Sequence, residues 1–332
     1  MARRLGGQVP TFQNVGDYAY SRGADAVAMF EAYGRNYYDS QKYEMEVFFA
    51  RNERGDFAAK TICITKPRQN GKSYAARFYA VYMSVFEHRQ VLYSAHHSTT
   101  TNKMFKELCN LFESPERYPD FAEDVKTISH ARGYEGIYFK DWQDKDGNFH
   151  DGGCIEFATR TNSGSRGGTY SVIVIDEAQE MTAEEQEAML PTISASSDVK
   201  DSAKMPQQIF IGTPPGALCR GTVFKEMHDT AHSENAGSVW WLEWSIETDN
   251  LKDFVQTQEQ AIELAYQTNP AMGYRIAEKT VLNEFETMTL EGYARERLGH
   301  WAPTITKKLD YAINKDAWNA CSSTELKPEG KT

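Results

Sequence analysis

The residues best suited to chemistry in this chain are Gly71, Lys72 and Ser73, which end a short polar loop. The apolar run 61–64 precedes the loop, and a helix is predicted over 72–86, so the local order is strand, loop, helix. In that order, backbone N–H groups of the loop and of the helix N-terminus converge on an anionic phosphate. Lys72 would then reach the β- and γ-phosphates of a nucleotide, and the Ser73 hydroxyl would ligate Mg²⁺.

The loop departs from the common phosphate-binding pattern at its first position. That pattern, G-x-x-x-x-G-K-[ST], has glycine where this chain has Lys66. The alternative interpretation is a helix that merely begins with Gly-Lys-Ser and binds no phosphate. The loop alone leaves both interpretations open.

Two adjacent carboxylates, Asp176 and Glu177, follow the apolar run Val172–Ile175. At the C-terminal end of a parallel strand, Asp176 would lie near the loop and hold Mg²⁺ through water, and Glu177 would polarise the attacking water. Paired acids after a strand also occur at the solvated start of a helix, where the helix dipole favours them. Together with the Gly-Lys-Ser loop, the acidic pair favours a nucleotide hydrolase.

Two further candidates are Thr213 and Arg166. Thr213 follows the apolar run 208–212 and would sense the γ-phosphate; the alternative is a Pro-Gly turn with no such role. Arg166 lies in the flexible segment 159–168, where glycines permit close approach. An arginine supplied in cis or by a neighbouring subunit stabilises the transition-state charge of a γ-phosphoryl group. From spacing alone, Arg166 is equally compatible with a mobile surface loop.

The elements that position these residues alternate between strands and helices. Apolar runs occur at 61–64, 90–93, 154–157, 172–175, 208–211 and 239–242, and helices are predicted over 72–86, 99–112 and 182–190. Runs without polar alternation are typical of strands covered on both faces of a parallel sheet. We therefore expect an α/β fold, with residues 118–151 as an insertion that contains a turn at 144–148.

We expect four parts along the chain. Residues 1–59 form an N-terminal segment with a helix over 40–51, and residues 60–245 form the α/β core. Residues 246–302 form a helical lid or linker with helices over 253–268 and 278–298, and residues 303–332 form a linker.

Composition excludes several classes of protein. The hydrophobic and charged fractions, 40% and 25%, are those of a globular chain and exclude a mainly disordered, collagenous or coiled-coil one. There is no apolar stretch long enough for a membrane span and no signal-peptide pattern at the start, so a cytoplasmic protein is expected. Five scattered cysteines are expected to be reduced. The net charge of −11 argues mildly against a protein that coats nucleic acid.

Taken together, these residues resemble the large subunit of tailed-phage terminases, the motors that pump double-stranded DNA into a procapsid. The resemblance extends from about Tyr38 to Trp301. It rests on Pro67–Ser73, Ser94–His96, Gly164–Gly167, Ile173–Ala178, Leu242–Ser245, Asn269–Gly273 and Ala294–Trp301. The implied fold is a helicase-like P-loop ATPase core of the ASCE type, with a mostly parallel sheet and a small helical lid.

The resemblance also implies roles for residues around the loop. Terminase loops lack the first glycine and carry an arginine four residues before the lysine, which is Arg68 here. ATP and Mg²⁺ would accordingly bind along Arg68, Gln69, Asn70, Gly71, Lys72 and Ser73. A glutamine at the position of Gln41 contacts adenine in that family.

For the remaining candidates, the resemblance implies that Asp176 serves the metal site and Glu177 catalysis. Thr213 would belong to the motif that couples hydrolysis to movement, and Arg166 would act on the nucleotide of a neighbouring subunit. The implied partners are double-stranded DNA, a portal protein, a terminase small subunit and further copies in a ring, expected to be a pentamer. Such a motor needs only a local positive lining, so the net charge does not exclude DNA.

Terminase large subunits usually continue into a nuclease domain, and the run 309–318 resembles the junction to it. We therefore expect a truncated ATPase domain or a naturally split subunit, with ATP hydrolysis and without nuclease activity. Two alternatives remain: a helicase-like ATPase that remodels nucleic acid without a capsid, and a nucleotide-binding assembly module without significant turnover.

Overall fold

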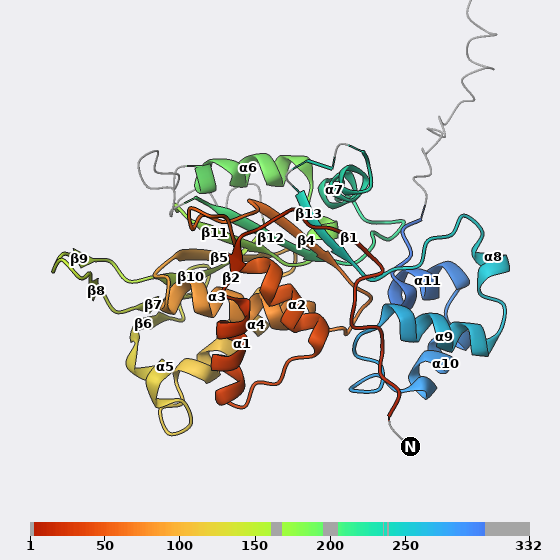
Figure 1. The fold of residues 1–332 in the computed structure, drawn as a ribbon, viewed down its shortest axis with the longest axis horizontal. Helices are drawn as coiled ribbons and strands as arrows, with labels where there is room; N and C mark the ends of the chain where they lie inside the picture. Colours follow the sequence, from red (N-terminus) through yellow and green to blue (C-terminus); the bar gives the residue numbers. More distant parts are fainter. Residues whose placement is uncertain (1–2, 161–167, 195–204, 235, 238, 303–332) are drawn as a thin grey trace, which may run out of the picture. The chain divides into compact units, whose positions relative to one another are not determined.

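A computed structural model describes residues 3–160, 168–194, 205–234, 236–237 and 239–302. Residues Met1–Trp301 form one compact unit, and a second unit, Ala302–Thr332, lies almost wholly outside the described residues. Figure 1 shows a twisted central sheet with helices on both of its faces. No helix among the described residues combines the length and the apolar character needed to cross a membrane.

The central sheet has nine strands in the order β1-β13-β4-β12-β11-β5-β10-β7-β6. All neighbours from β13 to β10 are parallel, whereas β1, β7 and β6 join antiparallel at the two edges. The strands are β1 (Phe12–Asn14), β4 (Thr61–Thr65), β5 (Gln90–Ala95), β6 (Val125–Ser129), β7 (Gly136–Phe139), β10 (Cys154–Thr159), β11 (Val172–Ile175), β12 (Gln207–Gly212) and β13 (Val239–Glu243). The predicted α/β class with a mostly parallel sheet is confirmed.

Helices cover the two faces of the sheet unequally. One face carries α1 (Gly23–Ala32), α2 (Asp39–Phe48), α3 (Lys72–Val85), α4 (Ser98–Phe112) and α5 (Pro119–Glu123); the other carries η1 (Ala178–Glu180), α6 (Ala183–Ser194) and α7 (Val223–Ala231). Two small antiparallel sheets of two strands pair β2 (Tyr20–Ser21) with β3 (Ala50–Arg51), and β8 (Trp142–Gln143) with β9 (Phe149–His150).

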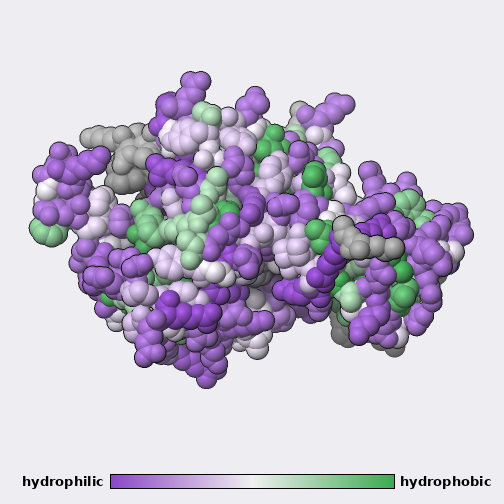
Figure 2. Space-filling view, turned by 60° about the horizontal axis from the view of Figure 1, so that its bottom comes forward, coloured by the Kyte–Doolittle hydropathy of each residue, from purple (hydrophilic) through white to green (hydrophobic). Residues whose placement is uncertain are grey.

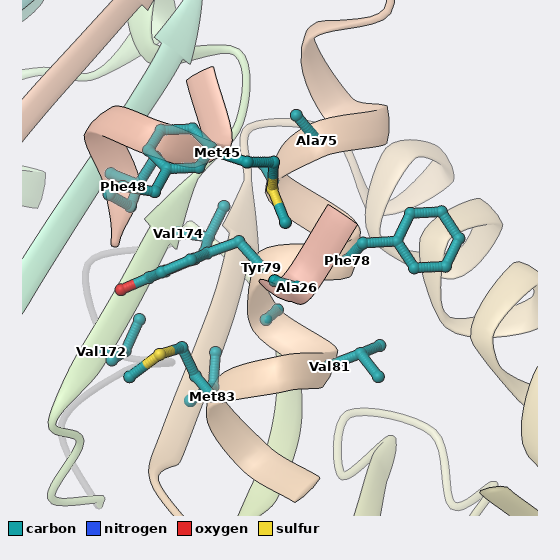
Figure 3. Close-up of a cluster of buried hydrophobic side chains, with 14 of the residues drawn as sticks. Ala26, Met45, Phe48, Ala75, Phe78, Tyr79, Val81, Met83, Val172 and Val174 are labelled. Atoms are coloured by element: carbon teal, nitrogen blue, oxygen red, sulfur yellow. The ribbon is translucent and has the colours of Figure 1, made fainter. Parts of the chain in front are cut away.

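Alternate side chains of the buried strands enter different apolar cores. Val172 and Val174 belong to the core beneath α3, and Ile173 and Ile175 belong to the core beneath α6 and α7. Figure 3 shows Val172 and Val174 beside Tyr79 of α3 in the larger core. Because successive residues of a strand point to opposite faces, an unbroken apolar run is what a sheet covered on both sides requires.

Two predicted regions differ in detail from the structure. The N-terminal segment contributes strand β1, which pairs with β13, whereas the sequence predicted only a helix there. A three-residue strand is too short to leave a periodic signal. The insertion over 118–151 adds β7 and β6 to the edge of the sheet, and its expected turn at 144–148 connects β8 to β9.

Residues 246–302, called the lid below, have an apolar core of their own. Their helices are α8 (Leu251–Phe254), α9 (Gln258–Thr268), α10 (Glu278–Thr287) and α11 (Leu290–Leu298). The two long helices predicted here are therefore each divided in two. The divisions fall at Thr257 and Thr289, whose hydroxyls cap the next helix by accepting hydrogen bonds from Gln260 N and Gly292 N. Figure 2 shows polar residues over most of one face of the molecule, with only scattered apolar patches.

Candidate active site

The parallel sheet brings the candidate residues to one edge. Strands β4, β11 and β12 end there together, so the loop after β4, the acids after β11 and Thr213 after β12 lie on neighbouring strands. Residues 66–71, called the phosphate loop below, connect β4 to α3, and Lys72 is the first residue of that helix. The α3 N-terminus therefore points its free N–H groups toward this edge.

The side-chain ammonium of Lys72 lies against the first two residues of the phosphate loop. Its Nζ donates hydrogen bonds to the carbonyl oxygens of Lys66 at 2.7 Å and Pro67 at 3.1 Å. Burial lowers the pKa of Lys72 to about 7, and the charge of Asp176 opposes that shift. A phosphate group beside Nζ would favour the protonated ammonium, since an opposite charge stabilises the charged form.

Ser73 and Asp176 meet directly, although 103 positions separate them in sequence. Ser73 Oγ donates a hydrogen bond of 2.8 Å to Asp176 Oδ2, and Tyr93 OH donates one of 2.6 Å to the same oxygen. The other carboxylate oxygen accepts from the backbone N of Glu177 at 2.8 Å. A hydroxyl and a carboxylate are hard oxygen donors of the kind Mg²⁺ prefers, so the residues fit this ion.

Glu177 occupies a strained and more exposed position beside Asp176. Its φ is 52°, which is rare for a residue with a side chain. Its carboxylate accepts hydrogen bonds from His97 N at 3.0 Å and from Thr100 Oγ1 at 2.8 Å, both at the N-terminus of α4. These two hydrogen bonds orient the carboxylate, as a general base requires.

Lys66 explains why the phosphate loop lacks its first glycine. The Lys66 side chain is fully buried and forms an ion pair with Glu44 of α2, which is also fully buried. Its Nζ lies 4.2 Å from the ring centroid of Trp244. Burial lowers the pKa of Lys66 and raises that of Glu44, and their mutual attraction opposes both shifts. A glycine at this position could not anchor the loop to α2.

Asn70 joins the phosphate loop to the lid. It is fully buried, and its Nδ2 donates to Asn269 Oδ1 at 2.8 Å and to the loop carbonyl of Pro67 at 3.2 Å. Its Oδ1 accepts from Ala271 N at 3.0 Å. The loop and the first turn of the lid that follows α9 are thus held by shared buried hydrogen bonds.

The two residues before Asn70, Arg68 and Gln69, contact the lid at the protein surface. Arg68, whose side chain is mostly exposed, forms an ion pair with Glu296 of α11, and Arg68 N donates to Glu296 O at 3.1 Å. Gln69 has a φ of 65°, and its carbonyl accepts a hydrogen bond from Arg275. The side chain of Arg68 therefore points toward the lid rather than toward Lys72.

Gln41 borders a cavity of about 340 Å³ beside the loop. Its Nε2 donates to the carbonyl of Gly71 at 3.2 Å, and a Cβ at Gly71 would lie 2.4 Å from that nitrogen, so the approach requires glycine. Tyr38, Tyr74 and Arg275 also line the cavity. Aromatic rings and a side-chain amide next to a phosphate loop suit the flat, polar-edged base of a nucleotide.

Thr213 is connected to the acids through Gln179 of η1. Thr213 N donates a hydrogen bond of 3.2 Å to Gln179 Oε1, and Gln179 lies two residues after Glu177. Gln179 therefore connects the turn after the two acids with the end of β12. Arg166, by contrast, lies outside the described residues, as does the run 309–318 that resembles a domain junction.

Arg160 is a structural residue of the site that sequence reasoning did not assign. It is buried at the end of β10 and donates to the carbonyl oxygens of Asp176 and Glu177, each at 2.8 Å. Burial lowers its pKa, and the acids around it, Glu185 foremost, oppose that shift. Its position three residues after the apolar run 154–157 was the only signal, because a buried arginine and an exposed one look alike in sequence.

Comparison with known proteins agrees with this architecture. Residues 56–218 match a family model described as an AAA domain, and no curated protein sequence matches the chain. The crystal structure of the HK97 bacteriophage large terminase is similar with a TM-score of 0.63 and 15% identity, over 91% of this chain and 59% of that one. A variant of the Thermus phage P74-26 large terminase ATPase domain is similar with a TM-score of 0.51 and 14% identity, over 83% of this chain and 98% of that one.

These similarities establish the fold. The chain has the fold of the ATPase domain of phage large terminases, and it spans about three fifths of the length of the HK97 protein.

Proposed function

We propose that this chain is the ATPase motor domain of a phage terminase large subunit. The observation that carries the proposal is the contact of Ser73 with Asp176 beside Lys72, at the N-terminus of a helix that follows a buried strand. A hydroxyl, a carboxylate and an ammonium at one helix N-terminus are the groups that hold a nucleotide triphosphate and its Mg²⁺. The terminase fold supports the same interpretation.

Each group would have one task. Residues 69–73 would surround the phosphates, with Lys72 at the β- and γ-phosphates, and Arg68 would join them by leaving Glu296. Gln41 would contact the base in its cavity. Ser73 and Asp176 would hold Mg²⁺, which neutralises charge on the phosphate oxygens. Glu177 would orient the attacking water and accept its proton, and Thr213 would pass the change at the γ-phosphate to the loop after β12 through Gln179.

We further propose that hydrolysis drives the translocation of double-stranded DNA into a procapsid in the host cytoplasm. The support for this step is that the similar structures are those of phage large terminases. The motor would act as a homo-oligomeric ring, a pentamer, docked on a portal protein and supplied with DNA by a small subunit. Arg166 would complete the site of a neighbouring subunit in that ring.

The experiment is steady-state phosphate release measured against protein concentration, with and without double-stranded DNA. Specific activity should rise steeply with concentration, because a site completed by a neighbour requires assembly. Lys72→Ala should remove activity at every concentration, whereas Lys252→Ala on the lid surface should not. Flat specific activity, strand separation in a helicase assay, or activity retained in Lys72→Ala would each contradict part of the proposal.

A further inference from the structure

Two histidines and a glutamate meet on the sheet face opposite the phosphate loop helix. His228 and His232 lie one turn apart on α7 and at its C-terminal end, and Glu243 ends β13. Their ligand atoms all lie within 4.8 Å of one another. None of the three takes part in the nucleotide site. Two histidines and one carboxylate are a donor set that Zn²⁺ uses in proteins.

The two distances from Glu243 to the histidines are close to those of a tetrahedral metal site. Glu243 Oε2 lies 3.2 Å from His232 Nε2 and 3.5 Å from His228 Nε2. Ligand atoms placed about 2.0 to 2.1 Å from a tetrahedral ion lie about 3.3 Å from each other. The cluster therefore needs little rearrangement to accept an ion. Glu243 and His228 are largely buried, whereas the His232 side chain is 29% exposed, so water reaches the cluster at His232.

The imidazole of His228 lies between two carboxylates, those of Asp229 and Glu243. Trp241 Nε1 donates a hydrogen bond of 2.6 Å to Glu243 Oε2. The two imidazoles therefore approach an oxygen that already accepts a hydrogen bond. His228 Nδ1 lies 3.0 Å from Asp229 Oδ1. If His228 is neutral and donates to Asp229, its Nε2 lone pair faces the lone pairs of Glu243. A cation between Nε2 and Oε2 removes that repulsion.

The surroundings also resemble those of metal-binding histidines. Such a histidine usually donates its other N–H to a carboxylate, as His228 is placed to do with Asp229. Aromatic rings fix both imidazole planes: Trp301 stacks on His228 at 4.0 Å, and Phe12 stacks on His232 at 3.6 Å.

We propose that His228, His232 and Glu243 bind a divalent transition metal ion, with Zn²⁺ as the best fit and water as the fourth ligand. The ion would fasten α7 to β13. Helix α7 follows the segment that begins at Thr213, and β13 leads into Trp244 and the lid. The metal would thus stabilise the junction between the end of β12 and the lid.

The first test is direct metal binding to the intact chain. Protein stripped with a chelator is titrated with Zn²⁺ in excess Mg²⁺ and ADP, which occupy the proposed nucleotide site. One Zn²⁺ per chain should bind and raise Tm by about 5 °C at a hundredfold excess over Kd. Co²⁺ should give the intense visible absorption of a tetrahedral complex. No saturable binding, or a weak octahedral Co²⁺ spectrum, would overturn the proposal.

Variants test whether the metal ion binds at this cluster or at another site. His232→Gln should weaken Zn²⁺ binding at least about a hundredfold, and Asp229→Asn about tenfold, because it no longer orients His228. His232→Cys should still bind and should add a sulfur-to-metal charge-transfer band to the Co²⁺ spectrum. His130→Gln removes a ligand from a second three-donor cluster, Cys109, Glu113 and His130, and should change nothing. Undiminished binding in His232→Gln, or loss in His130→Gln, would assign the metal elsewhere.

Discussion

The two sides of the proposed nucleotide site are held in different ways. On one side, Lys66 and Asn70 fasten the phosphate loop to α2 and to the lid through fully buried side chains. On the other side, Glu177 rests on the N-terminus of α4 through two hydrogen bonds near solvent. Buried polar contacts are costly to break, whereas contacts near solvent exchange readily with water. We infer that the loop side determines stability and the Glu177 side determines turnover.

The largest effect is expected when the buried ion pair on the loop side is broken. Lys66→Met should lower the free energy of unfolding by about 3 to 5 kcal/mol, because it leaves the Glu44 carboxylate buried without its partner. Urea unfolding would measure the loss. The double variant Lys66→Met with Glu44→Leu should recover most of the stability, since apolar replacement of a whole buried pair is often neutral. An equally unstable double variant would show that packing rather than charge was lost.

The pH dependence of Lys66→Met should identify Glu44 as the cause. Burial raises the pKa of Glu44, and without Lys66 that rise is less opposed. Above the unfolded-state pKa of about 4.3, the unfolded chain gives up a proton that the folded chain keeps, so stability falls as pH rises toward the folded-state pKa. The deficit relative to wild type should therefore shrink as pH is lowered from 8 to 5. Adding Glu44→Gln should remove this dependence.

A smaller loss is expected at the contact between the phosphate loop and the lid. Asn70→Ala leaves Ala271 N without its partner and removes one of the two hydrogen bonds to Asn269 Oδ1, so it should cost about 2 kcal/mol of stability. Nucleotide affinity should fall with it, because the loop is no longer fixed. Asn283→Ala, on the exposed surface of α10, serves as the matched control and should change stability by no more than about 0.5 kcal/mol. Equal effects in both variants would contradict the assignment of stability to the loop side.

The smallest change is expected on the Glu177 side. Thr100→Ala removes one of the two hydrogen bonds that orient the carboxylate and should lower kcat about threefold to tenfold, with KM unchanged. Stability should change by about 0.5 kcal/mol or less, because the contact lies near solvent. Thr100→Ser keeps a hydroxyl and should restore kcat. A stability loss as large as that of Asn70→Ala would mean that both sides are structural.

Much of the fold could be predicted from the sequence, because the buried strands are clear apolar runs. The runs 172–175 and 208–211 are unbroken and apolar, as burial of a strand on both faces requires. Gly71, Lys72 and Ser73 indicate a helix N-terminus. The meeting of Ser73 with Asp176 follows from parallel strands that end at one edge.

Long-range polar contacts escaped prediction. Nothing in sequence pairs Lys66 with Glu44 or Asn70 with Asn269, because a buried polar pair is defined by tertiary packing rather than by spacing. Arg160 was passed over for Arg166 for the same reason: only the fold reveals that its guanidinium binds the carbonyls of the two acids.

Phosphate release by Glu177→Gln at saturating ATP and Mg²⁺, compared with wild type, tests the central claim most directly. Turnover should fall at least about a hundredfold, since general base catalysis typically contributes that much or more. Nucleotide affinity and Tm, measured on the same sample, should stay at wild-type values. Turnover close to wild type, or a loss of stability like that of Lys66→Met, would contradict the account.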